Sequence, residues 1–353
     1  MIRARFCWNG TFRGRHILTQ ILDPNDERLT WQGIVSMRRE GGSAMPWRLP
    51  EDRLDLYPPE GLQKCGSNPA GVRLSFRSDT GLVEGDLVPD AESTAVDLYV
   101  DRTFQASAPL EGRSGFSFKG LPVGEKLIEL WLPQLGTFRL KSLGLSEGAT
   151  LSYFEDTRPR WITYGSSISH CGAAESPSQT WPAIVAREHG LDLTCLGYGG
   201  NCHLEPMIAC MIRDMPADYI SIKIGINIYG AASLGPRTFR SAVIGFVETV
   251  REKHPDTPFA VVSSIVSLPK EVALNGAKMS METMRYEASE AVGALQAHGD
   301  KNLHYVDGLR ILGPEEAHML PDDVHPDAEG YKFMGRRFLN EVAEPLFTGQ
   351  SRG

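Results

Sequence analysis

Two short runs in the second half of the chain hold the residue types that nucleophilic catalysis requires. The first, Trp161–Ser169, predicts a strand that enters a tight turn with a serine at its tip. The second, Asp322–Pro326, holds a carboxylate and an imidazole just before a predicted helix. A serine hydroxyl becomes nucleophilic at ordinary pH when a histidine takes its proton and a carboxylate orients that histidine. The two runs therefore predict an acyl-transfer site, provided that folding brings them together.

Each run also has a plain structural interpretation. The serines after Gly165 are also compatible with a turn whose hydroxyls only cap a helix, and an Asp-x-x-His pair occurs by chance. Gly165 permits a turn that a larger residue would resist, and such a turn would expose Ser167 above the sheet. Because other serines flank Ser167, Ser166 is the next candidate for the nucleophile.

Two further segments could bind a developing negative charge. Leu196–Asn201 is glycine-rich, and a loop of this kind can bring the N–H of Gly200 close to a ligand. Asn227 follows a predicted central strand, at the end of a parallel sheet where ligands bind. Both segments are equally compatible with ordinary turns, an Asx-type turn in the case of Asn227.

The elements that would position these residues alternate between strands and helices. Strands are predicted at 161–164, 193–196, 219–224, 259–266 and 303–306, and helices at 179–188, 205–214, 236–253, 280–298 and after Pro326. This repeat predicts a parallel sheet covered by helices on both faces. We expect a flavodoxin-like α/β domain of five strands in the order 2-1-3-4-5.

The first half of the chain has a different pattern. Apolar and polar residues alternate at 71–77, 95–100 and 126–132 between turn-rich segments, and no long helical pattern interrupts them. Such short strands predict an antiparallel β-sandwich. We therefore expect two domains, a jelly-roll-like sandwich over 1–155 and a catalytic α/β domain over 156–353, joined by a linker at 154–160.

Composition narrows the classes of partner. The 353-residue chain has a net charge of -8 and a pI of about 5.7, which argues against nucleic-acid and anionic-membrane partners. It has neither a membrane-spanning apolar run nor the apolar core of a signal peptide at its start, so we expect a cytoplasmic protein, with a processed secreted protein still open.

The six cysteines show no zinc-like spacing, so we expect mostly reduced thiols, no metal and no cofactor. The oligomeric state is left open.

The order of these segments resembles the SGNH (GDSL-like) hydrolases over roughly residues 158–345. The matching blocks are Gly165-Ser166-Ser167, Gly200, Gly225-x-Asn227 and Asp322-x-x-His325. This chain departs from the family in having Ser166 where an Asp is usual. The resemblance implies that Ser167 is the nucleophile, His325 its base and Asp322 the orienting acid. It also implies an oxyanion hole formed by the N–H of Ser167, the N–H of Gly200 and the amide of Asn227.

The first half adds a finer resemblance. The segment 94–101, Thr-Ala-Val-Asp-Leu-Tyr-Val-Asp, is similar to the Asp-Leu-Tyr signature of a sandwich domain that precedes some SGNH catalytic domains, with Ala95 in place of the usual Gly. An acyltransferase that attaches salicylate to a tetracycline scaffold has a similar architecture. The resemblance therefore implies that transfer to an alcohol other than water must be considered beside hydrolysis.

The expected function is a serine esterase that removes a small, acetyl-type acyl group from a sugar or another alcohol. An acyltransferase with the same residues is the alternative, and a catalytically inert carbohydrate-binding protein is the alternative from another class. An α/β-hydrolase is disfavoured because Ser169 stands where the G-x-S-x-G elbow needs glycine. By their place after strands, His170 and Tyr229 are predicted to contact substrate. The segment 267–284 is either a lid or a plain surface loop.

Overall fold

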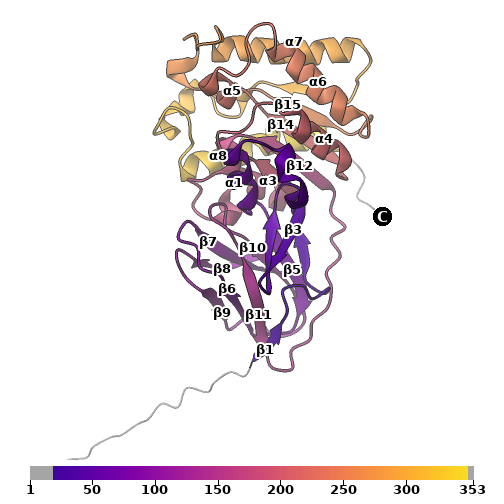
Figure 1. Ribbon diagram of the computed structural model, residues 1–353, viewed down its shortest axis with the longest axis vertical. Coiled ribbons are helices and arrows are strands. Elements are labelled where there is room, and N and C mark those ends of the chain that lie inside the picture. Colours follow the sequence, from indigo (N-terminus) through magenta and orange to yellow (C-terminus); the bar gives the residue numbers. More distant parts are fainter. Residues whose placement is uncertain (1–18, 349–353) are drawn as a thin grey trace, which may run out of the picture.

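The computed structural model describes residues 19–348, which form two layered units stacked along the long axis of the molecule (Figure 1). The N-terminal unit holds two antiparallel sheets, and the C-terminal unit holds a parallel sheet with helices around it. A β-sandwich followed by an α/β domain is therefore confirmed.

Two sheets face each other in the N-terminal domain. The first has the order β3-β4-β11-β6-β9, with β1 also paired to β11. Its strands are β1 (Thr19–Leu22), β3 (Ser36–Glu40), β4 (Ser43–Trp47), β6 (Leu82–Leu87), β9 (Gly115–Lys119) and β11 (Leu140–Ser146). The second has the order β2-β5-β10-β7-β8. Its strands are β2 (Thr30–Gln32), β5 (Arg73–Ser78), β7 (Ala95–Val100), β8 (Thr103–Pro109) and β10 (Lys126–Trp131).

The inner faces of both sheets supply one apolar core, which includes Phe76 and Ile128 from the second sheet and Leu143 from the first. This core explains the alternating pattern, because every second side chain of a strand points inward. Two short helical segments, η1 (Glu51–Leu56) and α1 (Glu60–Ser67), were not predicted. Each is too short to show a helical period in the sequence.

The C-terminal sheet is parallel throughout and has the order β13-β12-β14-β15-β16. Its strands are β12 (Arg160–Gly165), β13 (Asp192–Gly197), β14 (Tyr219–Lys223), β15 (Phe259–Val262) and β16 (Leu303–Val306). Numbered within this domain, the order is 2-1-3-4-5, as predicted. The carboxyl ends of β12, β13 and β14 thus lie side by side at one edge.

Helices cover both faces of this sheet. The α-helices are α2 (Ser167–His170), α3 (Trp181–His189), α4 (Pro206–Asp214), α5 (Ile226–Ala231), α6 (Phe239–Arg251), α7 (Met281–Ala297), α8 (Ala328–Phe338) and α9 (Glu344–Leu346). The shorter segments are η2 (Pro177–Gln179), η3 (Leu268–Lys270), η4 (Gly308–Arg310), η5 (Pro314–Met319) and η6 (Leu339–Ala343). One core holds side chains of α4, α6 and α7, and the other holds side chains of α3 and α8.

One strand is shorter than its sequence predicts. The apolar run 259–266 predicted a single strand, but β15 ends at Val262 and residues 263–266 continue as a buried loop. Backbone carbonyls outside the sheet ladder pair with this loop: the N–H of Ser263 donates to Val306 at 3.1 Å, and the N–H of Val266 donates to Leu312 at 3.0 Å. The loop's own side chains bond to neighbouring backbone, since Ser263 Oγ accepts from the N–H of Gly308 and Ser264 Oγ donates to the carbonyl of Ile224, both at 2.9 Å. A run of buried residues does not by itself distinguish a strand from such a loop.

The Asp-Leu-Tyr segment lies at the interface between the two domains. Asp97, on β7, is fully buried, and its Oδ2 accepts hydrogen bonds from Ser176 Oγ at 2.6 Å, Ser178 Oγ at 2.6 Å and the N–H of Ser178 at 3.0 Å. Tyr99 Oη lies 3.1 Å from Ser178 Oγ. The segment thus fastens β7 to the loop that precedes α3.

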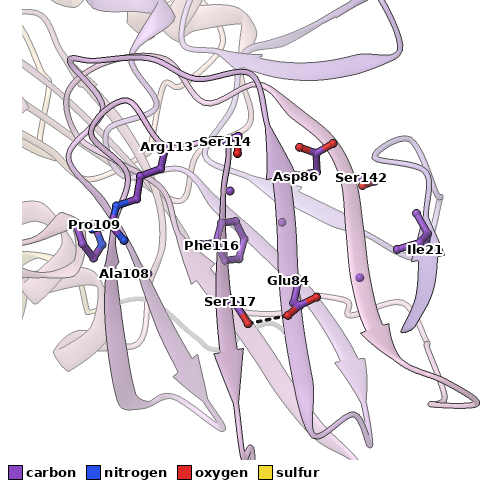
Figure 2. A pocket seen from close by; sticks show the side chains of 13 residues that line it. Ile21, Glu84, Asp86, Ala108, Pro109, Arg113, Ser114, Phe116, Ser117 and Ser142 are labelled. Atoms are coloured by element: carbon purple, nitrogen blue, oxygen red, sulfur yellow. Dashed lines mark hydrogen bonds between the residues drawn. The ribbon is translucent and has the colours of Figure 1, made fainter. Parts of the chain in front are cut away.

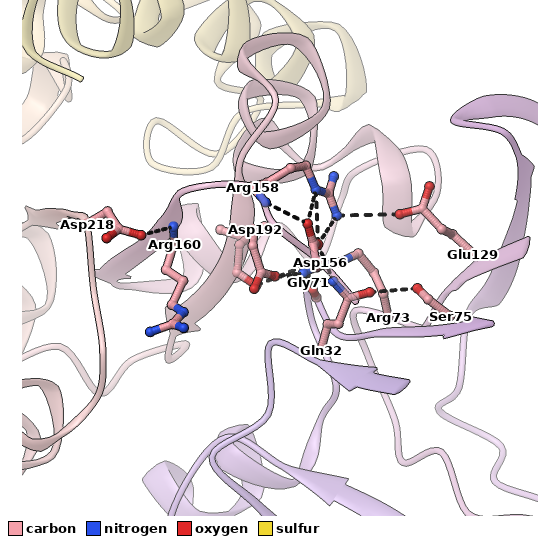
Figure 3. Close-up of polar contacts among 11 residues, drawn as sticks. Gln32, Gly71, Arg73, Ser75, Glu129, Asp156, Arg158, Arg160, Asp192 and Asp218 are labelled. Atoms are coloured by element: carbon pink, nitrogen blue, oxygen red, sulfur yellow. Dashed lines mark hydrogen bonds and ion pairs between the residues drawn. The ribbon is translucent and has the colours of Figure 1, made fainter. Parts of the chain in front are cut away.

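A buried ionic cluster lies at the same interface (Figure 3). Arg73 is fully buried and pairs with Asp192 at the start of β13, and Arg158 lies 2.5 Å from Asp156 and 3.6 Å from Glu129. Burial lowers the pKa of Arg73 and raises that of Asp192. The segment 154–160, predicted as a linker, is therefore packed between the domains, with Phe154 and Arg158 buried.

We predict that Asp97→Ala destabilises the protein by about 2–4 kcal/mol, because it leaves the buried donors of Ser176 and Ser178 without an acceptor. Thermal or urea unfolding will measure the loss. Asp86→Ala is the matched control, since the Asp86 side chain is 53% exposed on the same domain. Equal stability of Asp97→Ala and Asp86→Ala would show that Asp97 does not fasten the domains.

Candidate active site

The turn after β12 presents one serine to a histidine from the far end of the chain. Ser167 begins α2, and its Oγ lies 2.7 Å from His325 Nε2. Ser166 is buried, and its Oγ accepts a hydrogen bond from the N–H of Ile168 at 3.2 Å as the cap of α2. The structure thus brings Ser167, and not Ser166, to the imidazole.

His325 is held from behind by Asp322. His325 Nδ1 lies 2.6 Å from Asp322 Oδ2, and the other carboxylate oxygen accepts from the N–H of His325 at 2.6 Å and of Val324 at 3.0 Å. A ring nitrogen that faces a carboxylate carries the proton, so in the neutral ring Nε2 is the basic nitrogen that faces Ser167. Partial burial opposes ionisation of Asp322, but these hydrogen bonds outweigh it and lower its pKa to about 2.

The glycine-rich loop after β13 lies against the nucleophile. A Cβ placed on Gly199 would stand 3.7 Å from the Cβ of Ser167, and the N–H of Tyr198 donates to the carbonyl of Gly165 at 2.8 Å. Among residues 19–348, the N–H of Ser167 and that of Gly200 have no protein acceptor. Two backbone donors are therefore available beside Ser167 Oγ.

Asn227 offers a third donor. It lies in the first turn of α5, and its Oδ1 accepts from the N–H of Cys202 at 3.1 Å, which leaves its NH2 group to face elsewhere. The turn before it requires glycine: Gly225 has φ +126°, and a Cβ there would lie 2.1 Å from Ser264 Oγ. Asn227 is thus tied to the same loop that carries Gly200.

The position of His170 corrects the prediction that it contacts substrate. The side chain is 3% exposed, and its Nε2 donates to the backbone oxygen of Gln134, 2.6 Å away in the N-terminal domain. Burial, together with the nearby charge of Arg48, lowers the pKa of His170 to about 3. The neutral ring therefore holds α2 against the sandwich and is out of reach of a substrate.

Tyr229 lies two residues after Asn227, half-buried on α5. Its hydroxyl donates to the carbonyl of Ala273 at 3.2 Å, and Asn275 Nδ2 donates to the carbonyl of Tyr229 at 2.9 Å. Ser267 Oγ donates to the carbonyl of Asp323, next to Asp322, at 2.7 Å. The segment suggested as a lid thus contacts both the Tyr229 helix and the loop that carries Asp322 and His325. It exposes three large apolar side chains, Leu268, Val272 and Leu274.

The sequence interpretation missed His203 as a neighbour of this site. Its Nε2 donates to the carbonyl of Gly200 at 3.0 Å, and its Nδ1 lies 2.8 Å from Ser233 Oγ. Its position just after the glycine-rich loop was the only signal. Within residues 19–348 there is no group of three or more His, Cys, Asp or Glu side chains that could hold a metal, and the cysteines there are all free thiols.

A sizeable depression lies outside this site. A depression of about 570 Å³ opens over β6 and β9 of the sandwich, with Phe116 and Arg113 among its lining residues (Figure 2). Its lining includes none of the predicted catalytic residues.

Across residues 19–348, no helix is long and apolar enough to cross a membrane.

A sandwich followed by this parallel sheet, with Ser167, His325 and Asp322 in one hydrogen-bonded line, is an arrangement of SGNH-type hydrolases and acyltransferases. Residues 159–340 match the GDSL-like lipase/acylhydrolase family, and residues 29–141 match the N-terminal domain of SsfX3. The chain belongs to the GDSL-like lipase/acylhydrolase family. A search of the curated proteins finds no match.

Solved structures agree with this assignment. The chain is similar to the salicylyl-acyltransferase SsfX3 from a tetracycline biosynthetic pathway, with 35% identity and a TM-score of 0.87 over 95% of this chain and 99% of that chain. A GDSL-like lipase from Bacteroides ovatus has 22% identity and a TM-score of 0.75 over 95% and 100%. A family two carbohydrate esterase from Clostridium thermocellum, in complex with cellohexaose, has 13% identity and a TM-score of 0.66 over 90% and 99%. The last two share the fold.

We predict that Asp322 titrates near its lowered pKa of about 2 and stays ionised down to about pH 3. Because folding lowers the pKa from 3.8 to about 2, the stabilising contribution of this carboxylate is fully present at neutral pH, declines as the pH falls below about 4, and is gone once the pH has fallen through about 2. Carboxyl-carbon NMR will measure the titration. In His325→Ala the pKa should rise but stay below 3.8, since the backbone donors remain. A parent pKa near 4 would contradict the hydrogen-bonded geometry.

Proposed function

We propose that the protein is a serine esterase that cleaves a small acyl ester, acetyl-type, of a sugar or another alcohol. The observation that supports this function is the unbroken line from Ser167 Oγ through the imidazole of His325 to the carboxylate of Asp322. These groups have the order and the distances that general-base activation of a hydroxyl needs.

In the proposed reaction, Ser167 Oγ attacks the ester carbonyl carbon while His325 Nε2 takes the hydroxyl proton. The tetrahedral intermediate collapses, the bond to the alcohol oxygen breaks, and His325 returns the proton to the leaving alcohol. Asp322 stays ionised and stabilises the imidazolium. Water, deprotonated by His325, then attacks the acyl-serine, releases the acid and restores the hydroxyl.

The N–H groups of Ser167 and Gly200 and the amide of Asn227 are the proposed oxyanion donors. Their contacts support this role, because the Gly199–Gly200 loop lies against Ser167 and the same loop fixes the amide of Asn227 through Cys202. Donors that are held in place before the reaction stabilise the developing charge without reorganising. The mechanism needs neither a metal nor a cofactor.

An acyltransferase that uses the same residues is the second candidate. It is favoured by the 35% identity to a salicylyl-acyltransferase over 95% of this chain, including the N-terminal domain. The exposed apolar side chains of Leu268, Val272 and Leu274 beside the site would suit an acceptor with an apolar face. Because water competes for the acyl-serine, a transferase must hold its acceptor well or exclude water.

We predict that Ser167→Ala and His325→Ala each lower kcat by about 10⁴-fold or more, with the fold intact. Asp322→Asn should lose activity by a smaller factor, because Ser167 and His325 remain in place. Asn227→Ala should lose about 10²–10³-fold in kcat, the usual effect of removing one oxyanion donor. Steady-state hydrolysis of a chromogenic acetyl ester measures all four variants.

Ser166→Ala is the matched control, since it removes a hydroxyl from the neighbouring residue that only caps α2. It should keep activity within about tenfold of the parent, because a helix cap affects stability more than chemistry. Full activity in Ser167→Ala, with loss in Ser166→Ala, would move the nucleophile to Ser166. Sugar binding that survives Ser167→Ala, with no ester cleavage by the parent, would indicate an inert carbohydrate-binding protein.

The choice between esterase and transferase is tested by the fate of the acyl group. We expect the parent to release free acid from the chromogenic ester at a rate that added sugar or aromatic alcohols leave unchanged. Mass spectrometry of the products, with and without each alcohol, identifies the acceptor. Slow turnover in water that one class of alcohol accelerates, with formation of its ester, would establish the acyltransferase.

A further inference from the structure

Arg48, in the N-terminal domain, is a buried cation that acts on the glycine-rich loop of the other domain. The side chain is 0% exposed, and it donates to backbone carbonyls: those of Asn68 at 2.5 Å, Cys65 at 2.6 Å, Gly197 at 2.8 Å and Cys195 at 2.9 Å. Among the described residues no acidic side chain pairs with it. Burying an unpaired charge is unfavourable, so the arrangement calls for a role beyond stability.

The contacts of Arg48 lie at the end of β13 that enters the site. Cys195 and Gly197 are in the last half of this strand, and the ring of Tyr198 lies beneath the guanidinium, 5.3 Å from its centre. Tyr198 Oη donates to the carbonyl of Arg48 at 2.5 Å. Arg48 of the N-terminal domain thus holds Gly197 and Tyr198, the two residues that lead into the Gly199–Gly200 loop.

The next peptide unit carries the proposed oxyanion donor. Cys65 Sγ, on α1, donates to the carbonyl of Gly199 at 3.4 Å, and Asn201 Nδ2 donates to the same oxygen at 2.5 Å. A trans peptide is planar, so the carbonyl of Gly199 and the N–H of Gly200 point in opposite directions. Whatever holds that carbonyl therefore also aims the N–H of Gly200.

Helix α1 also keeps Asn201 in place. A Cβ on Gly61 would lie 3.2 Å from Asn201 Nδ2, so the absence of a side chain there lets the amide reach Gly199. Arg48 in turn holds the carbonyl of Cys65, in the same helix. The contacts form one path from Arg48 through α1 to the Gly199–Gly200 peptide.

The other end of β13 offers a matched comparison. Arg73 is as fully buried as Arg48, comes from the same domain, and donates to the carbonyl of Leu193 at 2.9 Å and of Gly71 at 2.8 Å (Figure 3). It pairs with Asp192 at the start of the strand, whereas Ser167 and Gly199 lie at the opposite end. Two buried arginines therefore hold the two ends of one strand, and only Arg48 contacts the site loop.

We propose that Arg48 and Cys65 are positioning residues that aim the Gly200 N–H at the oxyanion, so that the N-terminal domain completes the oxyanion hole. This inference rests on the proposed function. A donor aimed at the transition state affects kcat rather than ground-state binding. Loss of a residue that only stabilises the fold would not lower kcat while leaving KM unchanged.

The first experiment compares Arg48→Met with Arg73→Met in hydrolysis of the chromogenic acetyl ester. Both variants should unfold at lower temperature. Arg48→Met should lower kcat at least about tenfold with KM within about twofold, because only the oxyanion donor is misaligned. Arg73→Met should keep kcat, per folded molecule, within about twofold of the parent.

Binding of phenylboronic acid, which forms a tetrahedral adduct with an active serine, gives an independent readout. Its inhibition constant should rise about tenfold in Arg48→Met and stay unchanged in Arg73→Met. Equal kcat losses in the two variants, or a change confined to KM, would overturn the inference. Loss of ester cleavage in Ser167→Ala tests the proposed function separately, so an active parent with an unaffected Arg48→Met refutes only the positioning role.

If Arg48→Met does not fold, substitutions of Cys65 test the same inference. Cys65 is only partly buried, so Cys65→Ala removes one donor to Gly199 without opening a large cavity. We expect Cys65→Ala to lower kcat about threefold or more, and Cys65→Ser, which keeps a donor, to recover most of that loss. Identical kcat in the parent, Cys65→Ala and Cys65→Ser would refute the path through Cys65.

Discussion

The contact between Ser167 Oγ and His325 Nε2 is the interaction on which the proposed chemistry depends. It joins residues 158 positions apart in the sequence, so no local preference can create it. The parallel sheet sets the position of the serine by ending β12 at the edge where β13 and β14 also end. Packing of α8 and α3 in one core places the loop that carries the histidine over the same edge. A hydrogen bond of proton-transfer length results only when both placements hold.

Each group at the site is held in place by its own hydrogen bonds, and most of these come from another part of the chain. Asp322 is oriented by backbone donors of its own loop, that loop is fixed by Ser267, and Asn227 is fixed by Cys202. The glycine-rich loop is held by the sandwich. Such distributed support keeps donors aimed before substrate arrives, which is how an enzyme stabilises charge without reorganisation. The N-terminal domain is thus joined to the catalytic half by buried polar contacts and not by a flexible tether.

Much of the fold follows from periodicity. The strands predicted at 95–100 and 303–306 match β7 and β16 residue for residue, and the expected order 2-1-3-4-5 is one of the few that right-handed βα crossovers allow. Periodicity shows which face of an element is apolar and must therefore be buried against another element, and this pattern is local to the element. It failed where burial and regular structure separate, as in residues 263–266, which are buried without belonging to a strand, and in the eight-residue helix α1.

For the site, the sequence determined the residue types, their order along the chain and the local Asp322–His325 pair, because two side chains three positions apart in one turn can reach each other. Only the tertiary structure decided which serine meets the imidazole, and that His170 faces Gln134 instead of a substrate. It alone showed that the buried Arg48 side chain donates to the carbonyl of Gly197 in the glycine-rich loop. Hydrogen-bond partners distant in sequence are chosen by packing within and between the two domains, and a single sequence carries no local signal of that choice.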